Sequence, residues 1–259
     1  LVAKEIGVDI KITTGPAIER AGDLASILSS LEPRDILFID ECHRLHRTIE
    51  EILYPAMETG KIHLVMGKGL GARMISLDLP PFTLIAATTR ADLLSAPLRS
   101  RFGAIFQLDY YNQVEMEAIL RRSANLLGIK IEPEAIRIIA QSSRFTPRLA
   151  NRLLKRARDF AEVSNLKIVD QAAVEETLGL MDIDSLGLDA FDRKLLEIII
   201  DKFRNRAVGI NALAAALGEE RRVIEEIHEP YLLKMGLLQR TSGGRMATEE
   251  AIKHLARSH

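Results

Sequence analysis

The chain has 259 residues, a formal net charge of −1 and 47% hydrophobic residues, which supplies enough apolar material for the cores of two or three domains. The near-neutral charge excludes a protein that grips nucleic acid through overall positive charge, so any such binding depends on local patches. The single cysteine, Cys42, excludes an internal disulfide framework and a cysteine-rich zinc site, and the six histidines show no metal-ligand spacing.

The apolar runs and the first residues of the chain indicate the cellular compartment in which the protein is expected. No stretch approaches the roughly 18 uninterrupted apolar residues of a membrane span, and no signal peptide is recognisable. We therefore expect a cytoplasmic protein with no membrane partner. Leu1 opens directly into an apparent mid-helix, so we also expect the chain to be a fragment of a longer protein.

The first 107 residues alternate strand and helix signals. Strands are predicted at 9–13, 36–40 and 82–89, helices at 1–7, 21–31 and 47–57, and a two-stranded excursion at 61–80. This βαβα series predicts a parallel sheet with helices on both faces.

Strand signals then stop, and helical periodicity continues to about residue 181. A small helical domain is the natural interpretation. After a linker near 185–190, three predicted helices are followed by two short strands that meet at a glycine-containing turn, an arrangement typical of a winged helix. We place the three domains at residues 1–110, 111–184 and 185–259.

Two acids follow directly on a strongly apolar strand. ILFID, residues 36–40, reads as a parallel strand covered on both faces, so Asp40 and Glu41 are expected in the crevice beyond its carboxyl end. The pattern is typical of a Walker B segment, in which the first acid holds Mg²⁺ through water and the second polarises the water that attacks ATP. The alternative is a strand that ends at an acidic N-cap for the helix at 47–57.

Further polar residues are expected near these acids. Thr88 and Thr89 end a strand of the same sheet. Thr89 is expected to position the attacking water or to sense the γ-phosphate, and the alternative is a β-branched residue that simply finishes the strand. Arg99 and Arg101 lie at 95–103, where a proline and a glycine discourage regular structure. A stiff loop suits an arginine finger for a neighbouring subunit's ATP, and the alternative is a solvated loop arginine.

One helix start in the second domain combines several favourable residues. Thr146 is a good N-cap, Pro147 a good first helical residue, and Arg148 follows, so an arginine stands at a helix N-terminus that already attracts phosphate. The remaining basic residues of this helix are interpreted as a solvated face: Arg152, Lys155, Arg156 and Arg158.

The predicted winged helix contains nearly equal numbers of basic and acidic residues, so its positive charge must be placed locally. Arg221, Arg222, Arg240 and Arg245 are the arginines expected to meet phosphates. No recognition face rich in Asn or Gln is evident, so we expect backbone contact without base readout. The alternative is a winged helix used for protein contact.

The excursion at 61–80 contains two apolar strands joined by a glycine-rich turn. It has more apolar residues than a hairpin can hide, which favours a docking site for a partner protein. The alternative is a hairpin packed back on its own sheet.

The motifs ILFIDECH, ATTR, PLRSRFG and TPR follow one another in the order of an AAA+ ATPase. Together with TTGPAIERAGDLA, EEILYPAME, GLDAFDRKLL and QRTSGGRMAT, they resemble the RuvB family, the AAA+ motors of Holliday-junction branch migration, over essentially the whole chain. The resemblance implies an α/β fold: a parallel-sheet AAA+ ATPase domain, present in part, a helical lid and a C-terminal winged helix.

The resemblance also implies roles for individual residues. By resemblance, Asp40 and Glu41 are the Walker B pair, Thr89 is sensor 1, Arg101 rather than Arg99 is the finger, Tyr111 is a nucleotide-pocket residue and Arg148 is sensor 2. Arg240 and Arg245 are implied to contact DNA. It implies ATP and Mg²⁺ as cofactors, and a homo-hexamer acting on double-stranded DNA at Holliday junctions. The implied protein partners are RuvA, through the hairpin at 61–80, and the RuvC resolvase.

The sequence departs from the family pattern at several points. No GxxxxGK[ST] phosphate loop occurs in the 259 residues, so we expect poor ATP binding by this chain alone. Phe145 and Ala86 stand where the family usually has glycine, and Gly243 replaces a wing arginine. Two rival hypotheses are a non-catalytic DNA-binding AAA+ relic and a clamp-loader-like switch, the latter disfavoured by the winged helix.

Overall fold

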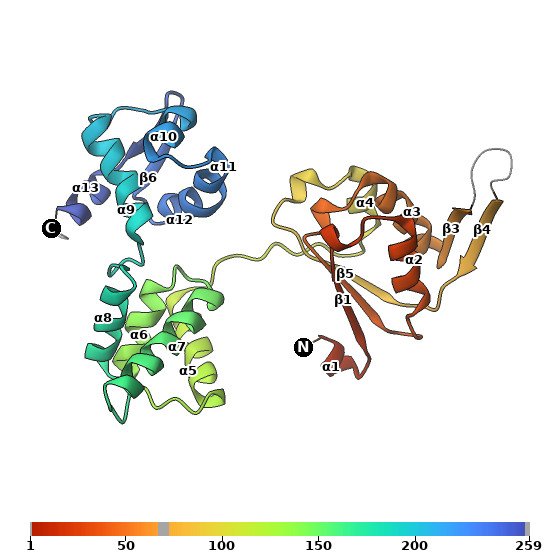
Figure 1. Ribbon diagram of the computed structural model, residues 1–259, viewed down its shortest axis with the longest axis horizontal. Coiled ribbons are helices and arrows are strands. Elements are labelled where there is room, and N and C mark those ends of the chain that lie inside the picture. Colours follow the sequence, from red (N-terminus) through yellow and green to blue (C-terminus); the bar gives the residue numbers. More distant parts are fainter. Residues whose placement is uncertain (1, 67–72, 257–259) are drawn as a thin grey trace. The chain divides into compact units, whose positions relative to one another are not determined.

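The computed structural model describes residues 2–66 and 73–256, which fall into two compact units, residues 1–107 and 108–259 (Figure 1). Among these residues, the first unit contains one cluster of buried apolar side chains and the second contains two. None of the helices in the described residues is both long enough and apolar enough to cross a membrane.

The first unit is built on a parallel sheet with the strand order β1, β2, β5. These strands span Ile10–Thr14, Ile36–Asp40 and Thr83–Ala86. In the central strand Ile36, Leu37 and Ile39 are at most 1% exposed, which confirms the predicted strand covered on both faces. Because all three strands are parallel, their carboxyl ends meet at one edge of the sheet.

Short helices connect and cover these strands. They are α1 (Val2–Ile6), η1 (Gly15–Ala17), α2 (Ala21–Ser29), η2 (Cys42–Arg44), α3 (Arg47–Thr59), η4 (Ala91–Leu93) and α4 (Ala96–Arg101). The loop predicted at 95–103 was wrong, because most of it is helix α4. Ser95 caps this helix by accepting a 3.3 Å hydrogen bond from the Leu98 N–H, and Pro97 lies in the first turn, where a missing N–H breaks no helical bond.

The excursion is an antiparallel hairpin of β3 (Lys61–Met66) and β4 (Arg73–Asp78), in register from Lys61 opposite Asp78. Figure 1 shows it extending away from the parallel sheet. Ile62 of β3 is fully buried, whereas every residue of β4 is exposed, including Met74 at 72%. The predicted glycine-rich turn lies outside the described residues.

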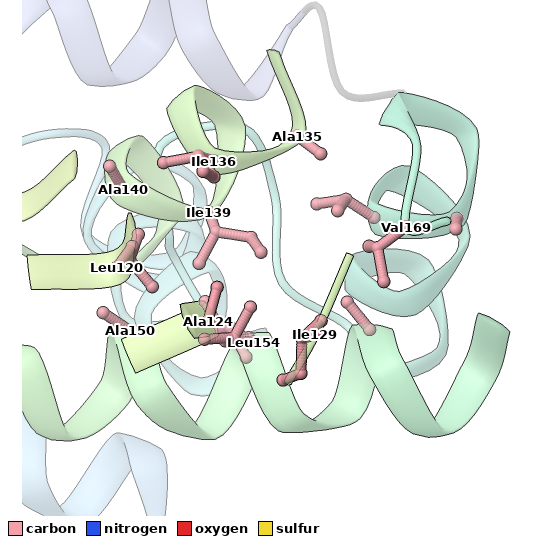
Figure 2. Close-up of a cluster of buried hydrophobic side chains, with 14 of the residues drawn as sticks. Leu120, Ala124, Ile129, Ala135, Ile136, Ile139, Ala140, Ala150, Leu154 and Val169 are labelled. Carbon is pink, nitrogen blue, oxygen red and sulfur yellow. The ribbon is translucent and has the colours of Figure 1, made fainter. Parts of the chain in front are cut away.

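The second unit begins with a bundle of four helices, α5 (Gln113–Leu126), α6 (Pro133–Ser142), α7 (Pro147–Val163) and α8 (Gln171–Leu180). Figure 2 shows its core, where Leu120 of α5, Ile139 of α6 and Leu154 of α7 lie among other buried apolar side chains. The predicted N-cap Thr146 was wrong in one respect. Its hydroxyl makes no cap bond and instead donates to the Ser143 carbonyl oxygen at 3.1 Å.

A helix and hairpin domain follows, with its own core. Its elements are α9 (Ala190–Glu197), the π-helix η5 (Ile198–Lys202), α10 (Ile210–Leu217), α11 (Arg221–Val223), the π-helix η6 (Ile224–His228), α12 (Glu229–Lys234), β6 (Leu238–Thr241), β7 (Gly244–Ala247) and α13 (Glu249–Leu255). Helix α13 was not expected from the sequence. The β6–β7 hairpin is the predicted wing, and Gly244 is required in it because a Cβ there would lie 2.2 Å from the Val208 carbonyl oxygen.

A buried polar junction joins these two parts of the second unit. Arg144, whose side chain is 14% exposed, pairs with Asp189 at 2.8 Å and with the fully buried Asp192. Its Nε–H also donates to the Gly187 carbonyl oxygen at 2.8 Å. Asp192 in turn lies 2.7 Å from Nδ1 of His228.

The spacing of Asp189, Asp192 and His228 would suit a metal ion, since their ligand atoms lie within 4.8 Å of one another. The guanidinium of Arg144 already provides positive charge at both carboxylates. The cluster is therefore a buried ion-pair network that fastens the helical bundle to the domain after it.

Candidate functional site

Asp40 ends β2 and is exposed at the carboxyl edge of the sheet. Its Oδ1 accepts the N–H of Glu41 at 2.9 Å, and its partner in the adjacent strand is Thr14. Within the described residues, Oδ2 makes no hydrogen bond or ion pair. A carboxylate with one free oxygen at this edge fits a hydrated Mg²⁺, which binds through one or two carboxylates and retains several waters.

Glu41 has left-handed backbone angles, with φ 51° and ψ 38°. Such angles are uncommon for residues other than glycine, and here they turn the chain sharply at the end of the strand. The turn also brings its backbone against Gly15, where a Cβ would lie 2.4 Å from the Glu41 carbonyl oxygen. Gly15 is therefore needed for this turn, while the Glu41 side chain stays 43% exposed.

The His43 imidazole connects Glu41 to the end of β5. This side chain is 5% exposed, and its Nε2 lies 3.5 Å from Oε2 of Glu41. Its Nδ1 lies 2.9 Å from the Thr88 hydroxyl oxygen, which also accepts the N–H of Arg90 at 2.9 Å. Two carboxyl ends of neighbouring strands are thus bridged by one buried ring.

Cys42 lies beside the acids without taking part in this bridge. It is 2% exposed, and its backbone N–H donates to the Ala87 carbonyl oxygen at 3.0 Å. Burial, reinforced by the nearby carboxylates, raises the pKa of the thiol to about 11. The thiol is therefore protonated near neutral pH and is a poor nucleophile.

Arg101 is held within its own unit. Its Nη1 donates to the Pro97 carbonyl oxygen at 2.8 Å, and its guanidinium carbon lies 4.4 Å from the centre of the Tyr54 ring. Nε lies 2.9 Å from Oε1 of Glu58 without hydrogen-bond alignment, so that contact is an ion pair only. In the single chain the guanidinium of Arg101, the predicted finger, is therefore held by residues of its own unit. Arg99 nearby is exposed.

The other predicted nucleotide-site residues are exposed. Thr89 belongs to the first unit with Asp40 and Glu41, whereas Tyr111 and Arg148 belong to the second. Tyr111 is 43% exposed, and Arg148 stands in the first turn of α7 as the sequence predicted. Their proposed roles at the nucleotide stay predictions.

The two wing arginines share a buried carboxylate. Glu229 is fully buried and pairs with both Arg240 and Arg245. Arg245, whose side chain is 13% exposed, also reaches Glu225 at 3.0 Å, whereas the Arg240 side chain is 53% exposed. Arg221 lies on the surface and pairs with Glu225 at 2.9 Å. The wing therefore presents Arg240 to solvent far more than Arg245.

Sequence reasoning assigned no role to four residues that these contacts single out. His43 comes two residues after Glu41, and Gly15 precedes a proline, so both carried a local signal. Thr88 was expected at the same edge of the sheet as the acids but without a partner, and Glu229 carried no signal because its partners lie far away in the sequence.

Two relatives extend over nearly the whole chain. The Holliday junction branch migration complex subunit RuvB of Fusobacterium nucleatum is 51% identical over 254 residues, covering 98% of this chain and 76% of the relative. The protein of the same name from Chloroflexus aggregans is 54% identical over 255 residues, covering 98% and 73%. The chain belongs to the RuvB family.

Family models and solved structures agree with this assignment. The RuvB P-loop domain model, described as a Holliday junction DNA helicase, matches residues 1–108, the RuvB AAA lid domain matches 111–184, and the RuvB C-terminal winged helix domain matches 185–256. The Thermotoga maritima RuvB Holliday junction branch migration motor is 46% identical with a TM-score of 0.84, covering 98% of this chain and 80% of that one. A point mutant of the same Thermotoga protein gives a TM-score of 0.85 at 47% identity, with 98% and 81% coverage.

Proposed function

We propose that this chain is the ATP-hydrolysing motor subunit of a Holliday junction branch-migration complex that acts in recombination and repair. The observation that carries the proposal is the Asp40–Glu41 pair at the carboxyl edge of a buried parallel strand, in a chain of the RuvB family. Such an edge is where open parallel sheets bind their ligands.

The chemistry follows from the positions of the acids. Asp40 would hold Mg²⁺, which neutralises phosphate charge when bound, and Glu41 would orient the attacking water and accept its proton. The water oxygen forms a bond to the γ-phosphorus as the bond from that phosphorus to the bridging oxygen breaks. ADP leaves with the electron pair, and phosphate is the second product. Thr89, Tyr111 and Arg148 are the proposed nucleotide contacts.

Assembly and partners complete the proposal. Relatives named as subunits of a branch migration complex support a multi-subunit assembly, for which we take a homo-hexamer in the cytoplasm. Its DNA would be the double-stranded arms of a Holliday junction, met by the exposed Arg221 and Arg240, while Arg245, which is 13% exposed, would hold Glu229 in place instead of contacting phosphate. The exposed strand β4 of the hairpin suits docking of RuvA, and RuvC is a further candidate partner.

Hydrolysis is tested with this chain joined at its N-terminus to a segment that carries a GxxxxGK[ST] phosphate loop. The joined protein should hydrolyse ATP in the presence of Mg²⁺, and the 259-residue chain alone should not, because a triphosphate needs its backbone cradle. A Glu41→Gln variant is the control. If the joined protein turns over ATP no faster than this control, the chain is a DNA-binding relic and the motor assignment is wrong.

The finger is tested by mixing inactive subunits of the joined protein. Arg101→Ala should bind ATP but lose roughly 10³-fold in hydrolysis, and Arg99→Ala should lose much less. Mixed with Glu41→Gln subunits, Arg101→Ala subunits should form some interfaces with both groups intact and regain activity. If mixed rings, verified by mass, regain nothing, Arg101 does not act across subunits.

A further inference from the structure

The His43 ring is the polar side chain that controls the Glu41 carboxylate. Within residues 2–66 and 73–256, no other side chain makes a hydrogen bond or ion pair with that carboxylate, which is otherwise 43% exposed. Glu41 also has a left-handed backbone, which fixes the direction of its Cα–Cβ bond and leaves the carboxylate to be placed by its χ angles and by His43. A carboxylate that must orient one water molecule needs such a contact, because small misplacements cost catalysis heavily.

The partners of His43 determine where its protons lie. Nε2 lies 3.5 Å from Oε2 of Glu41, and we assign the ring proton to this nitrogen because an N–H is attracted to the carboxylate, whereas a bare lone pair would be repelled. In the neutral ring Nδ1 is then bare and accepts the Thr88 hydroxyl proton over 2.9 Å. The Thr88 oxygen in turn accepts the N–H of Arg90 over 2.9 Å. Hydrogen bonds therefore run from the Arg90 backbone through Thr88 to His43, and the ring meets Glu41 through a 3.5 Å contact at Nε2 that lacks hydrogen-bond alignment.

This chain of contacts crosses from one strand to the next. Beyond the end of β5, the sheet hydrogen bonds continue through Ala87, whose N–H donates to Ile39 and whose carbonyl oxygen accepts from Cys42. Thr88 is thus fixed to the strand that carries Asp40, and it immediately precedes the exposed Thr89. The buried His43 ring lies between Thr88 and Glu41, so the orientation of the Glu41 side chain depends on the position of Thr88 beyond the end of β5.

We propose that His43 is a positioning residue for hydrolysis: held by Thr88 through Nδ1, it directs Glu41 through Nε2–H and makes water activation depend on the end of β5. The inference rests on the proposed ATPase function and adds to it a second threonine, distinct from the predicted sensor Thr89. It assigns no direct contact with ATP to His43 or Thr88.

Two substitutions of His43 test the roles of its two ring nitrogens one at a time. The amide of a glutamine side chain can replace Nε2 and reach Glu41, whereas the shorter asparagine amide can replace only Nδ1 and reach Thr88. In the phosphate-loop-bearing protein, His43→Gln keeps the Glu41 contact but gives up Thr88, so kcat should fall by about threefold, whereas His43→Asn should lose roughly 10- to 100-fold in kcat with KM for ATP nearly unchanged. A ring that merely fills space predicts no advantage for His43→Gln, so equal losses, or a smaller loss for His43→Asn, would overturn the inference.

Thr88 provides a milder test if the His43 variants fold poorly. Thr88→Val is nearly isosteric and removes the hydroxyl, so kcat should fall by about threefold, as in His43→Gln, while Thr88→Ser should restore it. Unchanged kcat in folded Thr88→Val would overturn the inference. Failure of the parent protein to hydrolyse ATP would instead overturn the proposed function, and this inference with it.

A spectroscopic test uses the 259-residue chain and needs no hydrolysis. With ¹⁵N-labelled histidine at about pH 8, where neutral imidazole is the ordinary form, nitrogen chemical shifts should show His43 protonated at Nε2 and bare at Nδ1. Thr88→Val should move the Nδ1 resonance and Glu41→Gln the Nε2 resonance, with Thr89→Val as the control that moves neither. The opposite tautomer would overturn the inference even where hydrolysis is intact.

Discussion

The shared carboxylate of Glu229 predicts that the two wing arginines serve different purposes. Replacing Arg245 by alanine removes its pairs with Glu229 and with Glu225 and leaves the fully buried Glu229 with Arg240 alone. Replacing Arg240 removes a partner that is itself 53% exposed and leaves the buried Arg245 pair intact. The first change should therefore harm the fold and the second should mainly alter the surface.

The burial of Arg245, Arg240 and Glu229 determines how much each substitution should lower the free energy of unfolding. Breaking a buried ion pair costs about 3–5 kcal/mol, and the remaining Arg240 contact places Arg245→Ala near the lower end, at about 3 kcal/mol. For a unit of this size that corresponds to a loss of about 6–12 °C in Tm. Arg240→Ala should cost about 1 kcal/mol or less, because an exposed pair is screened by solvent.

The effects of the two substitutions on DNA binding should rank in the opposite order, with Arg240→Ala causing the larger loss. Each lost phosphate contact lowers the slope of log affinity against log salt by about one unit. Arg240→Ala should lower the slope by about one for any duplex sequence, and Arg245→Ala should leave it nearly unchanged below its Tm. The two together should therefore lower the slope by about one rather than two.

Calorimetry of the 259-residue chain measures the first effect, and fluorescence anisotropy with duplexes at several salt concentrations measures the second. Arg222→Ala is the control for stability, since Arg222 is 68% exposed and pairs with Glu226 one helical turn away. The reasoning is refuted if Arg245→Ala leaves Tm unchanged, or if it lowers the salt slope as much as Arg240→Ala does.

Three further predictions concern the site and the lid. Gly15→Ala should lower ATP hydrolysis of the phosphate-loop-bearing protein by more than about tenfold, because its Cβ would displace the Glu41 backbone, while Gly22→Ala, which has nothing within 4 Å, should not. Cys42 should resist iodoacetamide in the native chain at about pH 8, since its raised pKa keeps it protonated, and should react once urea unfolds the protein; equal rates would contradict its burial. Phe145→Gly should be more stable to urea than Phe145→Ala by about 1 kcal/mol, because φ is 53° there; the reverse order would remove the argument from backbone strain.

Local patterns predicted the central strand of the first unit well. The run Ile36–Asp40 has no polar alternation, so only a strand covered on both faces could bury it, and the structure has that strand at the centre of its sheet. The acids then had to stand at the carboxyl edge. The segment at 95–103 misled because its proline was interpreted as a helix breaker, whereas a proline in a first turn starts a helix.

Contacts between distant residues could not be predicted in the same way. Thr88 is 45 residues from His43, and its choice over Thr89 depends on which threonine faces the ring. Arg245 looked like a free cation because nothing in the wing sequence points to Glu229, which lies 16 residues earlier in a helix. Charge patterns indicate where arginines are, and burial of the opposing carboxylate decides which of them remain available.

Three of the eight residues other than glycine with positive φ in the described part of the chain are, or lie close in the sequence to, proposed nucleotide residues. Glu41 is one, and Arg144 and Phe145 are two in succession directly before helix α7, which carries Arg148 in its first turn. Such conformations cost free energy and persist only where surrounding contacts enforce them, as often happens at functional sites. For Arg144 those contacts are the carboxylates of the winged-helix domain, so the start of α7 cannot shift without moving that domain or breaking a buried ion pair. If Arg148 senses the nucleotide, the residues that turn the chain ahead of it already connect that helix end to the part of the protein proposed to hold DNA.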